Sequence, residues 1–392
     1  LIGTMFHFGV HEVTAFRGTH PWVLYLLPLA GFVIVSFYKL TETDGLGTDD
    51  IIDAVHEGKR LPILLLPAIF FGTVLTHLCG GSAGREGAAL QMGGTIGQCM
   101  GRTFRLDDRD LRVATLAGMA AFFSALFGTP LAATVFAIMV ISIGVIYHVA
   151  LYPSLLAALV AYGVSVRLGV EPTRFTVAVP DQSVGMFVRV AALGVLCALV
   201  SILFCKLMHG AGHLMKRIKN PWLRGICGGF AVIALTWIFG TDYNGAGMDI
   251  VTRAIEQETV AVPWAFLLKL VFTAVTLAAG FKGGEVVPSF FVGATFGCAV
   301  SPLLGLPVGF GAAVGLAAVF CGVTNCPVAS TLLAVELFGA EGMLYFALAC
   351  CLSYMLSGYQ GLYSSQTILY SKLKAQFINV HTNAYHAGEK TE

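Results

Sequence analysis

Long apolar stretches separated by short polar segments dominate this chain of 392 residues. Hydrophobic residues make up 57% of the sequence and charged residues only 11%, whereas a soluble domain carries roughly 25% charged residues. So little charge cannot cover a globule in water, and lipid must therefore be the solvent of this chain. The apolar stretches occupy residues 21–40, 61–79, 111–144, 149–168, 186–208, 224–240, 262–281, 288–304, 309–338 and 342–357.

The lengths of these stretches predict tilted and interrupted helices. Several differ from the ~20 residues that cross a bilayer, and many contain Gly or Pro. The polar segments between them are too short to form a separate soluble domain. We therefore predict an all-α, multi-pass membrane protein. The net charge of +1, without a basic tract, gives no indication of a nucleic-acid partner.

Three motifs occur twice in the same order, about 200 residues apart. The pairs are GLGTDDIIDA and GAGMDIVTRA, GREGAALQMGGTIG and GGEVVPSFFVGATFG, and FGTPLA and TNCPVA. Repeated halves whose broken helices meet at a substrate site are typical of secondary transporters. We predict a first repeat in residues 1–185, a second in residues 186–371, and a frayed cytoplasmic tail in residues 372–392. The pattern leaves open whether the repeats are parallel or inverted.

The glycine-rich segment GGSAGREGAALQMGG, residues 80–94, predicts an anion site. Its glycines leave backbone N–H groups exposed, and the helix expected to start near residues 85–87 carries a partial positive charge at its N-terminus. Glu86 lies at that end, so its carboxylate can take the place of an anion and leave it when protonated. Alternatively, Glu86 only caps the helix and pairs with Arg85. The position of this ionisable group between apolar stretches favours the functional interpretation.

Three further segments carry candidate residues. In the turn GLGTD, Thr48 and Asp49 are expected to cap a helix. In KGGEVVP, Pro288 fits the first turn of a helix, so the preceding valine amides are expected to face a cavity. Glu285 is a second ionisable residue there, and pairing with Lys282 is the alternative. In GYQGLYSSQ, Tyr363 offers a hydroxyl to an anion or, alternatively, anchors the chain at the membrane interface.

Other polar residues predict no further chemistry. The pairs His7/His11 and His209/His213 have helical spacing but lack carboxylate or cysteine partners, so we predict no metal site. No P-loop and no nucleophile–base arrangement is visible, and we predict no cofactor and no enzymatic activity. Glu336, deep in an apolar stretch, is expected to accept hydrogen bonds from a helix end.

Together, these motifs resemble the CLC superfamily of chloride channels and chloride/proton antiporters. The pattern of that family is GSGIP, then G(K/R)EGP, then GxFxP, then a Tyr near the last helix; here GLGTD, GREGA, GGEVVP and LYS stand in that order. The resemblance implies a CLC fold with two inverted repeats of broken helices. It also implies a homodimer with one pore in each subunit, in the cell membrane, such as the inner membrane of a bacterium.

The resemblance also assigns roles to individual residues. It implies that Glu86 is the gating glutamate, which exchanges its proton as anions pass. The residues that it implies around the anion are Gly45, Leu46, Gly47, Gly84, Arg85, Gly87, Ala88, Val286, Val287 and Tyr363.

Several departures from the general pattern resemble the fluoride/proton antiporter branch of the family. Leu46 replaces a serine, Ala88 replaces a proline, and Glu285 precedes Val-Val-Pro, in the context GGSAGREG and GGEV. This implies a secondary-active antiporter that exports fluoride in exchange for protons. A chloride/proton exchanger and a passive anion channel are the alternatives within the family, and a membrane-embedded enzyme is the alternative outside it. The expected partners are therefore fluoride or chloride, protons and membrane lipid.

Two absences complete the comparison with the family. Many chloride exchangers carry an inner proton-transfer glutamate after the segment that resembles FGTPLA, but FAIMVIS, residues 136–142, contains no carboxylate. The candidate for the second proton acceptor is then Glu285. The cytoplasmic CBS domains of many relatives are not expected here.

Overall fold

The computed structural model describes residues 1–259, 262–374 and 376–383. The first half contains α1 (Ile2–Thr19), η1 (Pro21–Leu26), α2 (Leu27–Leu40), α3 (Thr48–Glu57), α4 (Leu65–Leu78), α5 (Glu86–Thr103), α6 (Asp108–Phe127), α7 (Pro130–Met139), β1 (Ser142–Ile143), η2 (His148–Ala150) and α8 (Leu151–Arg167). The second half contains α9 (Val184–Met215), α10 (Pro221–Phe239), α11 (Met248–Glu256), α12 (Ala265–Ala278), α13 (Val286–Leu304), α14 (Val308–Thr324), α15 (Pro327–Phe338), α16 (Met343–Leu356), β2 (Thr367–Tyr370) and β3 (Phe377–His381).

The order of the helices repeats along the chain, as the duplicated motifs predict. α4 and α12 have bounds that differ by the same offset as the motifs, and α5 and α13 each begin directly after a Gly-rich segment. The long apolar stretches 111–144 and 309–338 are each broken into two helices. The breaks lie at Gly128 and Asn325, which have left-handed backbone conformations with φ of 72° and 61°. α9 begins at Val184, close to the predicted division at residue 185. The division itself remains a prediction.

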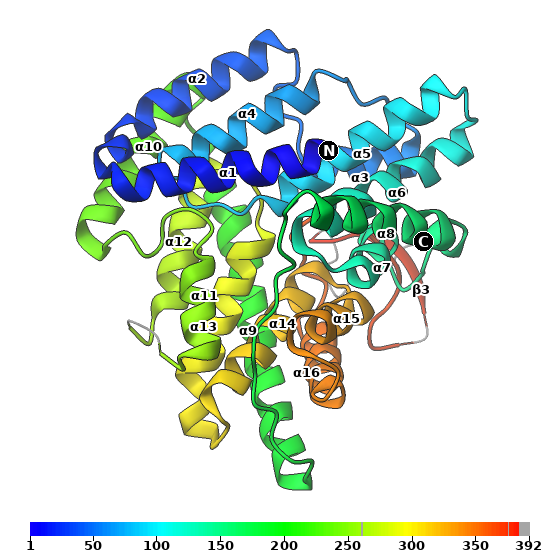
Figure 1. Cartoon of the computed structure of the whole chain (residues 1–392), viewed down its shortest axis with the longest axis vertical. Helices are drawn as coiled ribbons and strands as arrows, with labels where there is room; N and C mark the ends of the chain where they lie inside the picture. The colour runs from blue at the N-terminus through cyan, green and yellow to red at the C-terminus, as the bar shows by residue number, and fades with distance from the viewer. Residues whose placement is uncertain (260–261, 375, 384–392) are drawn as a thin grey trace.

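Six helices of the described residues are long and apolar enough to cross a membrane, and shorter apolar helices lie between them in the sequence. Figure 1 shows α1, α2, α4 and α5 together at one end of the molecule, with α9 and α11–α16 extending away from them. α10 crosses over and packs beside α2. The predicted all-α, multi-pass architecture is therefore confirmed.

Glycine allows the closest helix pairs to form in both halves. A Cβ on Gly93 in α5 would lie 2.3 Å from the Gly118 carbonyl oxygen in α6, and a Cβ on Gly293 in α13 would lie 2.4 Å from the Gly315 carbonyl oxygen in α14. Only residues without a side chain fit at such distances, because real Cβ atoms do not approach backbone so closely. The glycine content therefore explains why α5 packs on α6, and α13 on α14, with their backbones in contact.

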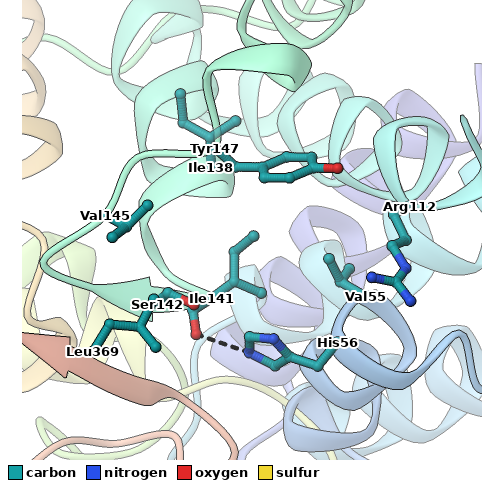
Figure 2. Close-up of a pocket in the computed structure, with 9 residues that line it drawn as sticks. All are labelled: Val55, His56, Arg112, Ile138, Ile141, Ser142, Val145, Tyr147 and Leu369. Carbon is teal, nitrogen blue, oxygen red and sulfur yellow. Dashed lines mark hydrogen bonds between the residues drawn. The ribbon is translucent and has the colours of Figure 1, made fainter. Parts of the chain in front are cut away.

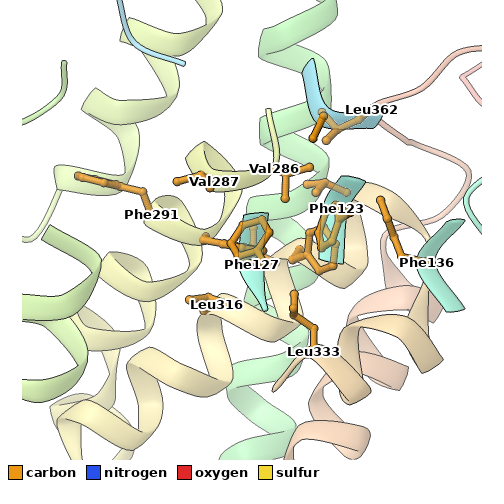
Figure 3. Close-up of a cluster of buried hydrophobic side chains, with 14 of the residues drawn as sticks. Phe123, Phe127, Phe136, Val286, Val287, Phe291, Leu316, Leu333 and Leu362 are labelled. Carbon is orange, nitrogen blue, oxygen red and sulfur yellow. The ribbon is translucent and has the colours of Figure 1, made fainter. Parts of the chain in front are cut away.

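A buried aromatic cluster joins the two halves. Phe127 at the end of α6 contacts Phe290 in α13, with ring centroids 5.7 Å apart. Phe136 in α7 contacts Phe320 in α14 at 5.5 Å, and Phe320 contacts Phe290 at 5.1 Å. Figure 3 shows Phe127 and Phe136 beside Val286, Val287 and Leu333, which belong to the second half. The same core includes Val286 and Val287, so the cluster borders the start of α13.

The prediction of a frayed tail is wrong for the described part of residues 372–392. β3 pairs antiparallel with β2, and β2 pairs parallel with β1, so the chain forms a three-stranded sheet. Ile143, Ile368 and Ile378 bury their side chains against one another, and this burial is what orders the segment. A strand this short carries too weak a pattern to be separated from a polar tail by sequence. Residues 375 and 384–392 lie outside the described residues.

Candidate functional site

The starts of α5 and α13 meet at a short backbone bridge between the two halves. The amide of Gly84 donates to the carbonyl of Gly284 at 2.7 Å, and the amide of Gly284 donates to the carbonyl of Gly84 at 2.8 Å. The two segments pair antiparallel, so the chain runs through them in opposite directions. Two helix N-termini, each with a partial positive charge, are therefore brought to one place.

This junction requires glycine. A Cβ on Gly284 would lie 2.2 Å from the amide nitrogen of Gly87, and a Cβ on Gly84 would lie 2.6 Å from Oε2 of Glu86. Any side chain at either position would therefore displace the other helix or the Glu86 carboxylate. The glycines were noted in the sequence for their exposed amides, but their stronger role is to let the two helix starts touch.

Glu86 is the first residue of α5 and is 1% exposed. Its Oε2 accepts a hydrogen bond from the amide of Arg85 at 2.9 Å. Its Oε1 lies 3.5 Å from Nε of Arg85. The carboxylate thus folds back over the helix start, as the capping interpretation expects. In doing so it also uses a backbone donor at the positive end of a helix, which is where an anion would bind.

Glu285 is the residue directly before α13, in the same position that Arg85 has before α5. A Cβ on Gly87 would lie 3.5 Å from Oε2 of Glu285, so this carboxyl group reaches the start of the other helix. The alternative pairing with Lys282 is not found among the described residues. Nζ of Lys282 instead lies 4.0 Å from the ring centre of Tyr38.

The turn GLGTD starts α3 differently from the prediction. Asp50 is the capping side chain, because its Oδ2 accepts from the amide of Gly47 at 2.9 Å. The expected caps point elsewhere: Thr48 accepts from Nε2 of Gln91 at 3.0 Å, and Asp49 accepts from the amide of Ser365 at 3.0 Å. Both residues have partners distant in sequence, which local spacing does not reveal. The prediction of Thr48 and Asp49 as caps is therefore wrong.

The backbone amides around the junction fall into two groups. Those of Leu46, Gly47 and Gly84 already donate to protein oxygens. In the first turns of α5 and α13, the amides of four predicted residues have no hydrogen-bond partner within the described part of the chain. These residues are Gly87 and Ala88 in α5 and Val286 and Val287 in α13. Each of the two meeting helices therefore contributes a pair of free donors from its first turn, one pair from each half.

Tyr363 lies in the loop after α16 and is 3% exposed. Its hydroxyl is buried and has no hydrogen-bond partner among the described residues. Glu285, Asp49 and Glu86 all lie within electrostatic range of this hydroxyl. A buried donor without a partner is costly, so this hydroxyl is a candidate for contact with a bound anion rather than an interfacial anchor.

A cavity of about 960 Å³ reaches this junction from one face of the molecule. Glu86, Arg85 and Val287 line it together with residues of α1 and of the segment before α11. Charged side chains of both signs, such as Arg17, Arg253, Asp242 and Asp249, also line it. The cavity therefore extends as far as Glu86.

Two basic residues that support this cavity were not singled out from the sequence. Arg17 donates to the carbonyl of His77, and Lys269, which is fully buried, donates to the carbonyls of Tyr243 at 3.1 Å and Gly245 at 2.6 Å. Lys269 thereby holds the turn that precedes α11. A lysine inside an apolar stretch gives no sequence signal for such partners, since carbonyl groups are present in every residue.

The remaining sequence predictions can be compared with the structure directly. Glu336 accepts from the amides of Leu131 at 3.1 Å and Ala132 at 2.8 Å, at the start of α7, so its predicted structural role is confirmed. Within residues 1–259, 262–374 and 376–383, no group of three or more His, Cys, Asp or Glu side chains has the arrangement of a metal site.

The fold, with broken helices that meet at their N-termini, defines a membrane protein of the anion transporter and channel class. The family model of the voltage gated chloride channel matches residues 26–358, and the chain belongs to this CLC family. It is a multi-pass protein of the cell membrane.

Individual relatives agree with this assignment. The chain is 39% identical to a chloride/fluoride channel protein of Pseudomonas syringae over 94% of its own length and 83% of that protein. It is 22% identical to the voltage-gated ClC-type chloride channel ClcB of Escherichia coli over 86% of its length and 84% of that protein.

Solved structures share the fold. A CLC-type fluoride/proton antiporter aligns with a TM-score of 0.90 and 33% identity over 94% of both chains. A slow cyanobacterial Cl⁻/H⁺ antiporter aligns with a TM-score of 0.78 and 19% identity over 91% of this chain and 90% of that one. The second likeness concerns the fold alone.

Proposed function

We propose that this protein is a secondary-active antiporter that exports fluoride across the cell membrane in exchange for protons. The observation that carries the proposal is the position of Glu86, whose carboxylate takes a backbone donor at the positive end of α5. The names of two relatives support the choice of ion, since one is a chloride/fluoride channel protein and another a fluoride/proton antiporter.

Competition for one position couples the two ions in this proposal. While ionised, the Glu86 carboxylate holds the Arg85 amide and repels an anion at the helix start. When it is protonated, the carboxyl group loses its charge and no longer repels an anion at the helix start. An anion then binds to the free donors of Gly87 and Ala88, opposite those of Val286 and Val287, and the Tyr363 hydroxyl completes the set. The segment before α3 borders this site with Gly45, Leu46 and Gly47.

Fluoride places a strong demand on such a site. It is small and holds its water tightly, so only close and numerous hydrogen-bond donors can replace that water. Two helix starts that converge provide donors of this kind, together with a buried hydroxyl that has no partner in the described ranges of the chain. Leu46 removes a hydroxyl that would favour chloride, but contributes no donor to fluoride.

Glu285 is proposed as the second proton acceptor. It lies at the start of α13, and its carboxyl group reaches toward Gly87 on the opposite helix. A proton leaving Glu86 would therefore meet this carboxyl group within the same junction, without an acidic residue in the segment after α7.

The proposal includes the architecture of the whole protein. Residues 1–185 and 186–371 form two inverted repeats, residues 372–392 lie in the cytoplasm, and two copies form a homodimer with one pathway in each. Only 22% of the apolar segment that contains α8 and is long enough to cross the membrane is buried within one chain. This helix therefore has faces free for lipid or for a second copy. No chemical reaction is part of this function.

Flux measurements on purified protein in liposomes test the proposal. Vesicles are loaded with fluoride or chloride, and anion efflux and proton uptake are recorded together. We expect fluoride efflux coupled to proton uptake. Chloride efflux at an equal rate would favour a chloride/proton exchanger. Anion efflux without proton uptake would favour a passive channel, and the lack of any anion flux would contradict transport altogether.

A further inference from the structure

The C-terminal strands hold the loop that carries Tyr363. We define the C-terminal clasp as β2, β3 and the two residues that follow, Thr382 and Asn383. β2 and β3 are fastened to the first half through β1, and their isoleucines are buried against Ile143. The clasp is thus an ordered segment joined to the first half, and its last residues return to the loop between α16 and β2.

Thr382 contacts the backbone of Tyr363 directly. Its hydroxyl lies 2.6 Å from the carbonyl oxygen of Tyr363 and 2.8 Å from that of Gln366, and its amide also donates to Gln366 at 2.9 Å. Thr382 is 2% exposed, so water does not replace these bonds. One hydroxyl from the end of the described chain therefore fixes the peptide group of the candidate anion ligand.

Gln366 anchors the other end of the same loop. Its side chain is fully buried, and Nε2 donates to the carbonyls of Val140 at 2.9 Å and Thr324 at 3.0 Å. Val140 follows α7 and Thr324 ends α14, so one amide group satisfies the C-terminal carbonyls of a helix from each half.

Two more hydrogen bonds hold the backbone of the same loop. The amide of Leu362 donates to Val323 at 2.9 Å, and the amide of Ser365 donates to Asp49 at the start of α3. Figure 2 shows that the carbonyl of Ile141 accepts from His56 of α3. The amide of Thr367 donates to the same carbonyl, so α3 and the clasp share this acceptor.

The contrast within Tyr363 is the key observation. Its backbone is held by Thr382 and by neighbouring residues on both sides, whereas its buried hydroxyl has no partner among the described residues. We propose that Thr382 is a positioning residue, through which the C-terminal clasp fixes the Tyr363 hydroxyl for contact with the transported anion. This inference rests on the proposed function of Tyr363 as an anion ligand.

Substitution of Thr382 tests the inference in liposomes of the full-length protein. Thr382→Val removes the hydroxyl but keeps the branched shape, and Thr382→Ser restores the hydroxyl. We expect the valine variant to raise the apparent KM for the anion about two- to tenfold, the worth of one hydrogen bond, with a smaller change in maximal rate. The serine variant should recover most of the affinity. Ser371→Ala is the matched control, because its hydroxyl, directly after β2, bonds to that of Tyr359 and not to the Tyr363 backbone.

A double-mutant cycle separates positioning from a general loss of stability. In a Tyr363→Phe background the hydroxyl is absent, so Thr382→Val should then change the KM little. An equal rise in both backgrounds, or a lack of recovery by serine, would overturn the inference. The cycle uses whichever halide the wild-type protein moves. Movement of chloride in place of fluoride therefore contradicts the proposed ion, while the KM comparison still tests Thr382.

Discussion

Glu285 carries the second carboxyl group at the meeting point of α5 and α13. We expect Glu285→Gln to reduce proton uptake by at least ~10-fold while anion efflux continues, because an amide keeps the shape of the side chain but cannot carry a proton. Proton uptake and anion efflux are measured in the same vesicles. Glu341→Gln, at an exposed position between α15 and α16, is the control for loss of a carboxylate. Unchanged proton uptake in Glu285→Gln would transfer this role to another group.

At the scale of single residues, sequence predicts those whose role depends on local chain geometry. Glu86 at a helix start and Glu336 near a helix end were found because their surroundings in the sequence indicate a helix terminus or a buried charge. The role of Asp49 was predicted wrongly and Gln366 was not singled out, because their partners lie far along the chain and only the fold brings them together. Lys269 was missed for the same reason.

At the scale of elements, the junction of the two helix starts depends on the absence of side chains. We expect Gly284→Ala to destabilise the protein by about 1–3 kcal/mol, the cost of overpacking a tight core, and to abolish transport by displacing the start of α5. The control is Gly163→Ala in α8, where an added Cβ meets nothing within 4 Å, and which should be neutral or slightly stabilising. Thermal unfolding in detergent checks both variants. An unperturbed melting temperature together with normal flux in Gly284→Ala would contradict the described junction.

The C-terminal clasp is expected to respond to pH through Lys372. This side chain donates to Asn325, Tyr354 and Ser357, and burial lowers the pKa of its ammonium group to about 7, from an ordinary value of 10.5. Between pH values of about 7 and 10.5, Lys372 therefore carries a proton more often when the clasp is unfolded and the side chain is exposed than when the clasp is folded. The stability of the folded clasp consequently rises as the pH increases through that range.

Hydrogen exchange of the β2 and β3 amides, corrected for intrinsic rates, measures this effect. Protection should increase with pH in the wild-type protein and lose most of this dependence in Lys372→Met, which keeps a similar length without a charge. Protection that falls over the same range, or an equal slope in both proteins, would contradict the assigned burial of the charge.

The order of elements shows why sequence predicts helices at this scale better than the small sheet. Apolar stretches and glycine breaks occur repeatedly and locate α5, α13 and the divided helices α6–α7 and α14–α15. β1 has only two residues, and β3 gains its stability from Ile143 and Ile368 in distant segments. No local signal therefore separated β3 from a frayed tail.

At the scale of the whole molecule, two halves with the same order of helices meet at the starts of α5 and α13. The antiparallel bridge between Gly84 and Gly284 and the aromatic contacts of Phe127, Phe290 and Phe320 hold the halves together at the candidate site. The duplicated motifs predict that such a meeting point exists. They do not predict which amides stay free, because the bridge itself consumes those of Gly84 and Gly284.

Coupled flux through the Glu86→Ala variant tests the central claim most directly. Without a carboxyl group at the start of α5, nothing competes with the anion or carries its proton. Proton uptake driven by a fluoride gradient should therefore fall by at least ~100-fold relative to wild type, in keeping with the worth of a positioned proton carrier, whether or not anion efflux continues. Fluoride efflux with proton uptake at the wild-type ratio in this variant would contradict the account.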